Sequence, residues 1–168
     1  MIGSIVLIGA PGSGKTTVGA MLAERLGVTF NDADAVIVER AGKSIAEIFT
    51  DDGEAAFRAL EEQVTAELLE LPGVLSLGGG AVLSSTTRAA LRSHRVVWLR
   101  IGLSQSVKRV GLDTARPLLL GNVRGQLLKL LNERAPLYAE VATEVVDTDD
   151  TTPTEVVETI MNAHAAHR

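Results

Sequence analysis

Residues 4–17 read SIVLIGAPGSGKTT: a short apolar run, a glycine-rich turn and the first residues of a helical pattern. Within this stretch, residues 9–16 (GAPGSGKT) match the motif G-x-x-x-x-G-K-[ST] at every defined position. In this motif the glycines allow backbone N–H groups to turn toward phosphate oxygens, and the helix that follows presents its positive end to them. The stretch therefore predicts a strand, a phosphate-binding loop and a helix in succession.

The residue types of this loop indicate which contacts each residue makes. Lys15 is expected to reach the β- and γ-phosphates of a mononucleotide, and the Thr16 hydroxyl to ligate Mg²⁺. The remaining nucleotide contacts are assigned to Gly12, Ser13, Gly14 and Thr17. A glycine-rich turn that only packs a helix on a strand is the alternative interpretation. The dinucleotide motif G-x-G-x-x-G does not fit, because Thr17 occupies the position of its last glycine.

Beyond this loop, apolar β-branched runs alternate with helical patterns. Strands are expected at residues 4–9, 28–31, 74–77, 96–101 and 144–147. Helices are expected at residues 15–26, 53–71, 84–92, 104–110, 125–138 and 153–165, and a further helix is expected to begin near residue 34. The alternation predicts an α/β fold with an open, mostly parallel sheet and helices on both faces, in three layers. Ligands of such sheets bind at the carboxyl ends of the strands.

The composition narrows the possible functions. The 168 residues suit a single domain spanning 1–168, and the 46% apolar and 22% charged residues are typical of a soluble globular protein. The absence of cysteine excludes disulfides and thiolate metal sites, and fits a reducing cytoplasm. The net charge of −5 argues against binding to nucleic acid or acidic membranes. With no apolar stretch of membrane-span length, we expect a cytoplasmic protein, monomeric by default.

A phosphate-binding loop does not by itself define a reaction, because kinases, ATPases, GTPases and motors share it. The guanine-reading segment N-K-x-D of GTPases is absent from the sequence, and so is the LSGGQ signature of transporter ATPases. The segment LSLGGG resembles that signature only superficially. Because the chain is too short for a motor, these observations favour a small-molecule kinase.

Two aspartates follow the second expected strand, in the segment NDADAVIV. Since alternate residues of extended backbone point the same way, Asp32 and Asp34 are expected to face one site. Phosphoryl transfer uses one carboxylate near Mg²⁺ and another that orients the acceptor hydroxyl and takes its proton. Asp32, nearer the strand end, is the candidate metal partner. Asp34 is the candidate base, with capping of the following helix as an equal alternative.

A second glycine run ends the third expected strand, in VLSLGGGAVL at residues 74–83. Three consecutive glycines are entropically unfavourable, so we expect another group to approach this backbone closely. If the first loop holds the phosphate donor, the second is the candidate site for the acceptor.

Several segments, taken in order, resemble the shikimate kinase family: GAPGSGKTT, NDADAVIVERAGKSIAEIFTDDGEAAFRALE, SLGGGAV, ARPLL, ERAPLYAEVA and VDTDDTTP. The resemblance covers nearly the whole chain, and residues 44–61 and the glycine run are its most specific parts. It implies a P-loop fold with a five-stranded parallel sheet and a mobile lid. It also implies transfer of the γ-phosphate of ATP, with Mg²⁺, to the 3-hydroxyl of shikimate in aromatic amino-acid biosynthesis.

The resemblance places the acceptor-binding region at about residues 33–61 and implies roles for its residues. Asp34 would be the base, and the substrate would be held by Arg58, Arg134, Gly79 and Gly80. Glu61 would pin the Arg58 guanidinium from three residues further along the helix. Phe49 and Phe57 would wall the pocket around the carbon ring. Without the resemblance, Arg58 would be read as a solvated helix residue and the two phenylalanines as core.

The resemblance also implies a lid and an adenine site. The lid is expected at about residues 111–125, where Arg116 would join Lys15 in neutralising the transferring phosphate. The alternative for Arg116 is a surface-loop arginine at a helix start. Arg109 and Pro153 would sandwich the adenine. Because the loop before Pro153 reads DTDDTT and is acidic, we expect weak base specificity.

Two other hypotheses remain open from the sequence alone. A kinase for gluconate or a nucleoside monophosphate would share the donor loop, but a polyol without a carboxylate would not need both Arg58 and Arg134. A non-catalytic nucleotide-binding regulatory module would keep Lys15 without any need for Asp34. It would bind ATP without turnover.

Overall fold

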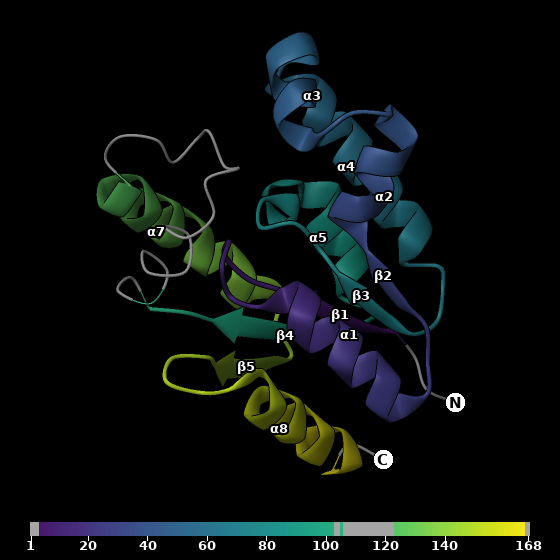
Figure 1. The fold of residues 1–168 in the computed structure, drawn as a ribbon, viewed down its shortest axis with the longest axis vertical. Helices are drawn as coiled ribbons and strands as arrows, with labels where there is room; N and C mark the ends of the chain where they lie inside the picture. The colour runs from purple at the N-terminus through teal and green to yellow at the C-terminus, as the bar shows by residue number, and fades with distance from the viewer. Residues whose placement is uncertain (1–3, 103–104, 106–122, 167–168) are drawn as a thin grey trace.

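The computed structural model describes residues 4–102, 105 and 123–166, and its centre is a parallel sheet. Its strands are β1 (Ile5–Ile8), β2 (Phe30–Asp32), β3 (Val74–Ser76), β4 (Arg95–Arg100) and β5 (Glu144–Asp147). They lie in the order β2-β3-β1-β4-β5, so β1 occupies the middle (Figure 1). Ile5 pairs with Val74 of β3 on one side and with Arg95 of β4 on the other. The predicted α/β class and five-stranded parallel sheet are confirmed.

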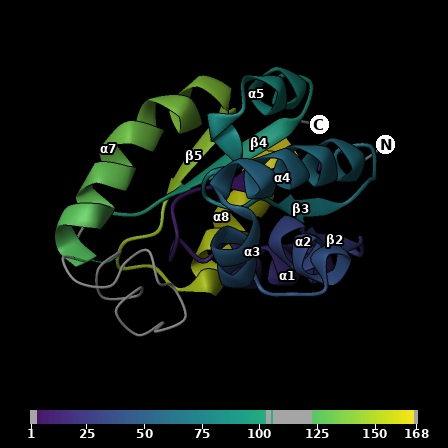
Figure 2. The same ribbon diagram turned by 90° about the horizontal axis from the view of Figure 1, so that it is seen from above.

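The burial of β1 explains the three layers. All four residues of this strand are buried, as expected where both faces of a parallel sheet are covered. Ile5 and Leu7 pack into a core with α1 (Lys15–Leu26) and α8 (Pro153–Ala166). Val6 and Ile8 pack into a second core with α4 (Glu54–Leu68), α5 (Ser85–Leu91) and α7 (Val123–Val141). The view from above shows these two groups of helices on opposite sides of the sheet (Figure 2).

Local sequence signals set several helix ends. Helix α1 ends at Gly27, whose φ of 68° and N–H bonds to Ala23 and Glu24 carbonyls form the expected cap. Helix α3 (Ile45–Asp52) begins with a capping box, in which Ser44 and Glu47 satisfy each other's backbone N–H groups. Helix α2 (Ala33–Ala41) begins directly after Asp32, and the short 3₁₀ helix η1 (Ala81–Leu83) follows the glycine run.

Several helix boundaries differ from the prediction. Gly53 lies outside α4 with φ 88° and ψ 165°, because it makes the turn between α3 and α4. Helix α4 ends at Leu68 rather than residue 71, since the residue before Pro72 disfavours helical backbone and the chain must enter β3. Helix α7 continues beyond the expected residues 125–138 at both ends. The helix predicted at residues 104–110 lies outside the described residues, apart from position 105.

Across the part of the chain that the structure describes, no helix combines the length and apolar character needed to cross a membrane.

Candidate active site

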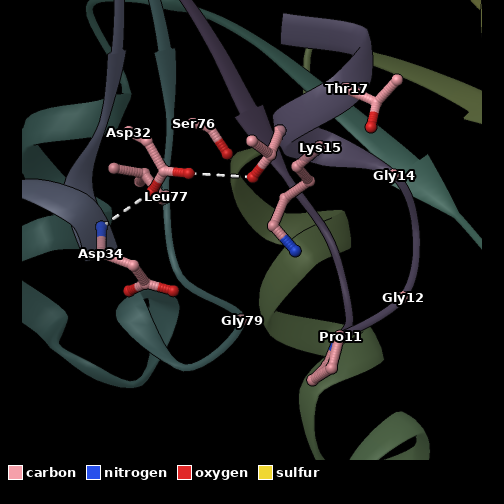
Figure 3. Close-up of a pocket in the computed structure, with 11 residues that line it drawn as sticks. Pro11, Gly12, Gly14, Lys15, Thr17, Asp32, Asp34, Ser76, Leu77 and Gly79 are labelled. Atoms are coloured by element: carbon pink, nitrogen blue, oxygen red, sulfur yellow. Dashed lines mark hydrogen bonds between the residues drawn. The ribbon is translucent and has the colours of Figure 1, made fainter. Parts of the chain in front are cut away.

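A cleft of about 150 Å³ opens at the carboxyl ends of β1, β2 and β3. It is lined by Pro11, Gly12, Gly14, Lys15, Thr16, Thr17, Asp32, Asp34, Ser76, Leu77 and Gly79. Lys15 and Asp34 point into the same space from opposite walls, with Gly79 between them (Figure 3). The structure thus brings the two glycine loops and the acid pair together, as the strand-end argument predicts.

The first loop has the backbone conformation of an anion-binding turn. Gly9, Gly12 and Gly14 have φ values of 153°, 85° and 91°, which side chains other than hydrogen rarely permit. Lys15 Nζ donates to the carbonyl oxygens of Gly9 at 2.7 Å and of Ala10 at 3.1 Å. The Ser13 hydroxyl is buried and makes no hydrogen bond within the described residues. A buried donor beside a lysine and a helix N-terminus fits a phosphate group.

Asp32 performs the capping role that was considered for Asp34. One carboxylate oxygen of Asp32 accepts from the backbone N–H groups of Asp34 at 2.9 Å and Ala35 at 3.4 Å. The extended-backbone argument for the pair is wrong, because α2 already begins at Ala33 and Asp34 lies in its first turn. Both carboxylates nevertheless line the cleft. Because Asp32 caps α2, the Asp34 carboxylate does not serve as the cap of this helix.

Thr16 and Asp32 offer two oxygens at one point of the cleft. The Thr16 hydroxyl donates to Oδ2 of Asp32 over 2.8 Å, across the gap between α1 and β2. Oxygen atoms of this kind are the ligands that Mg²⁺ prefers. Among the residues that the structure describes, no group of three or more histidine, aspartate or glutamate side chains could hold a metal alone. The residues therefore fit a Mg²⁺ ion that takes its other ligands from phosphate and water.

The second glycine run is required for space rather than for unusual dihedral angles. None of its three glycines has a positive φ, and Gly80 has a φ of −100°. A Cβ on Gly80 would lie 2.4 Å from Nη1 of Arg58, and one on Gly78 would lie 2.6 Å from Oδ1 of Asp34. The close approach expected here is confirmed. The groups that approach are charged side chains from three different helices.

Arg58 and Glu61 form the predicted pair on α4. Arg58 Nη1 donates to Oε1 of Glu61 at 2.8 Å, three residues along the helix. Glu61 is only 4% exposed, and this burial raises its pKa; the charge of Asp34 acts in the same direction, and Arg58 and Arg134 oppose it. The Arg58 side chain is largely buried at 25% exposure. Its interpretation as a solvated helix residue is therefore wrong.

Phe49 and Phe57 are core residues. Their ring centroids are 4.8 Å apart, and both rings pack into the core on the α4 side of the sheet. Phe57 also lies under Arg58, whose Cζ is 5.1 Å from the ring centroid. That Phe49 and Phe57 form a wall of the acceptor pocket remains a prediction.

Arg134 reaches the glycine run from α7, since a Cβ on Gly79 would lie 3.4 Å from its Nη1. The same helix supplies Tyr138, a residue that sequence reasoning missed. Its buried hydroxyl donates to the Gly79 carbonyl at 2.6 Å. The four-residue spacing between Arg134 and Tyr138 was the signal available in the sequence, because residues four apart on a helix share a face.

The adenine end is described only in part. Arg109, Arg116 and most of the expected lid at residues 111–125 lie outside the described residues. Pro153 begins α8 and is exposed. In the acidic loop before it, both carboxylate oxygens of Asp149 accept from the Gly102 N–H, at 3.1 and 3.0 Å. This aspartate is thus used to join the ends of β4 and β5.

Comparison with known proteins gives one consistent result. The family model described as shikimate kinase matches residues 11–165. The shikimate kinase of Thermobifida fusca is 59% identical over 156 residues, covering 92% of this chain and 91% of the relative. That of Saccharopolyspora erythraea is 55% identical over 165 residues, covering 97% and 94%.

The structural comparison agrees. A shikimate kinase from Acinetobacter baumannii, solved in complex with shikimate, superposes with a TM-score of 0.96. It is 36% identical to this chain, and the match covers 100% of this chain and 96% of that one. In agreement with the geometry of the site, the family-model match and the identity to these relatives show that the chain belongs to the shikimate kinase family.

Proposed function

We propose that this protein transfers the γ-phosphoryl group of ATP to the 3-hydroxyl of shikimate, giving shikimate 3-phosphate and ADP in aromatic amino-acid biosynthesis. The observation that carries the proposal is the set of charged groups around residues 78–80. A carboxylate (Asp34) and two guanidinium groups (Arg58 and Arg134) approach this run, and the same cleft contains Lys15. A phosphate donor site thus faces a site for an anionic acceptor.

The donor side binds and neutralises phosphate. Backbone N–H groups of the first loop, the Ser13 hydroxyl and the start of α1 surround the space for the β- and γ-phosphates. The Lys15 ammonium offsets charge that develops on the transferring group. When bound by Thr16 and Asp32, Mg²⁺ would add charge neutralisation of the phosphate oxygens.

The acceptor side binds a carboxylate and orients a hydroxyl. Guanidinium groups suit the planar carboxylate of shikimate, because they donate two parallel hydrogen bonds. Glu61 holds the Arg58 guanidinium in place from within the core. Asp34 would accept the hydrogen bond of the 3-hydroxyl and take its proton. The oxygen–phosphorus bond then forms as the bond from phosphorus to the leaving ADP oxygen breaks.

The roles of the remaining residues belong to the same proposal. Arg116 would act from a lid at residues 111–125, and Arg109 and Pro153 would hold the adenine. Phe49 and Phe57 would border the carbon ring of the acceptor. We also propose that the chain works as a single-domain cytoplasmic monomer. The shikimate complex of the A. baumannii relative supports the acceptor assignment.

The test is ADP release from purified protein and Mg²⁺-ATP, with shikimate, gluconate or nucleoside monophosphates as acceptors. We expect release that depends on shikimate and not on the other acceptors. Release with another acceptor would keep the kinase and refute the proposed acceptor. ATP binding without acceptor-dependent release would instead favour a regulatory nucleotide-binding module.

A further inference from the structure

One buried hydroxyl joins the glycine run to the helix that carries an acceptor arginine. Tyr138 lies on α7 and is 1% exposed, and its hydroxyl donates to the Gly79 carbonyl at 2.6 Å. These two residues are 59 positions apart in the sequence. The bond therefore holds a loop of the β3 end at a fixed distance from α7.

The same hydroxyl also contacts Arg134, one helical turn earlier. Burial raises the pKa of Tyr138 to about 12, and the charge and hydrogen bond of Arg134 oppose that rise. The phenol therefore stays protonated at ordinary pH. It donates its proton to the Gly79 carbonyl, and the Arg134 guanidinium lies beside the same residue, since a Cβ on Gly79 would be 3.4 Å from Arg134 Nη1.

Packing holds the Tyr138 ring firmly enough for its hydroxyl to set the position of a group that it contacts. It packs in the α4-side core against Trp98 of β4, with ring centroids 5.5 Å apart. A ring fixed between a helix and the central sheet gives its hydroxyl little freedom. Gly79 lines the cleft, and the Arg134 guanidinium lies next to it.

Any buried tyrosine hydroxyl needs a hydrogen-bond partner, so burial alone would indicate only stability. Here, however, both partners belong to the acceptor site. We propose that Tyr138 is a positioning residue, whose hydroxyl sets the Arg134 guanidinium and the Gly79 peptide relative to each other for binding of the acceptor carboxylate. This inference rests on the proposed function.

Tyr138→Phe tests the proposal, because it removes only the hydroxyl. We expect KM for shikimate to rise about tenfold, with KM for ATP and kcat within about twofold of wild type. The matched control is Thr143→Val, which removes a hydroxyl that donates to the Val96 carbonyl at the opposite edge of the sheet. It should change Tm without changing the ratio of the two KM values.

A double-mutant cycle separates positioning from general stability. If Tyr138 acts through Arg134, Tyr138→Phe should raise KM for shikimate less than about twofold in an Arg134→Lys background. Independent effects in the two backgrounds would overturn the proposal. So would an unchanged KM for shikimate in Tyr138→Phe, or an equal rise in both KM values with a lower Tm.

A second variant covers the case in which Tyr138→Phe does not fold. Gly79→Ala leaves the core intact but places a methyl group 3.4 Å from Arg134 Nη1 and 3.1 Å from Pro11 Cδ. Because Pro11 belongs to the donor loop, KM for ATP should rise as well, but KM for shikimate should rise more; an unchanged KM for shikimate would refute the coupling. Failure of the proposed function is distinguishable, because wild-type protein would then show no shikimate-dependent ADP release at all.

Discussion

The two glycine loops of the cleft follow neighbouring strands, yet their glycines meet different requirements. In the loop after β1, Gly9, Gly12 and Gly14 adopt positive φ, so the backbone itself is shaped to receive phosphate. In the loop after β3, Gly80 has ordinary dihedral angles, and a Cβ there would collide with Arg58. The first loop needs glycine for backbone conformation and, at Gly9, also for space, whereas the second loop needs glycine for space alone.

The difference shows which parts of the sequence determine recognition of the phosphate donor and which determine recognition of the acceptor. The donor loop can be read within a single continuous segment, because its own N–H groups and Lys15 make the site. The proposed acceptor site depends on side chains that α2, α4 and α7 bring to a loop with almost no side chains. Acceptor recognition should therefore be lost through changes distant in sequence, whereas donor recognition should respond mainly to changes within residues 9–17.

The largest effect should come from Asp34→Asn. We expect kcat to fall by about 10³-fold, because the variant removes the proton acceptor for the hydroxyl. ATP affinity, measured by calorimetry, should stay within about twofold of wild type, since Asp32 and not Asp34 caps α2. Asp51→Asn, at an exposed position on α3, is the matched control. Loss of ATP binding in Asp34→Asn would contradict the division between the two sides.

Arg58→Ala should have the next largest effect. KM for shikimate should rise by about 100-fold, because a charged hydrogen-bond donor is lost and Glu61 is left buried without it. KM for ATP should change little. Arg58→Lys keeps the charge but not the fork, so it should recover only part of the loss. Equal weakening of both substrates would contradict the acceptor assignment of Arg58.

A pair of glycine substitutions tests the comparison directly. Gly80→Ala should raise KM for shikimate by about tenfold through contact with Arg58, with KM for ATP unchanged. Gly14→Ala should raise KM for ATP by a similar factor and lower stability by about 1 kcal/mol, because φ is 91° although a Cβ would make only an ordinary contact with Val18 Cγ2 at 4.0 Å. Steady-state kinetics and thermal unfolding would measure both. If both variants affected the same substrate, the two loops would not differ as described.

The smallest effect should be a change in the pH dependence of stability in Glu61→Gln. Burial raises the pKa of Glu61 above its ordinary 4.5, so the folded protein holds this proton more tightly than the unfolded chain. The free energy of unfolding from this group therefore falls as pH rises from about 4.5 through the folded-state pKa. The Tm of Glu61→Gln relative to wild type should rise over that range. Glu70→Gln, at an exposed position, should show no such trend.

The sequence was sufficient to predict elements whose signals are local. The apolar strand, the motif at residues 9–16 and the Gly27 cap each lie within a few residues, and the structure matches them. Helix–strand alternation then led to the parallel sheet and to the strand ends as the site. The Arg58–Glu61 pair joins residues of one helical turn, but it was expected only from the family resemblance, because Arg58 would otherwise be read as a solvated helix residue.

Other features depend on tertiary contacts and had weaker local signals. Whether Asp32 or Asp34 caps α2 depends on where β2 ends, which Thr16 and the neighbouring strand help to set. Tyr138 was not singled out from the sequence, because its partner Gly79 comes from another element. The acceptor glycines indicated that something approaches closely, but not that the approaching groups would be side chains from three helices.

The central place of β1 also has a consequence for synthesis. This strand is made first, yet its two neighbours in the sheet are β3 and β4, the latter ending at Arg100. At about 5–20 residues per second, the ribosome therefore leaves β1 without its full pair of neighbours for on the order of 5–20 s. During that interval the apolar run Ile5–Ile8 is exposed, so nascent chains stalled before residue 95 should depend most strongly on chaperones.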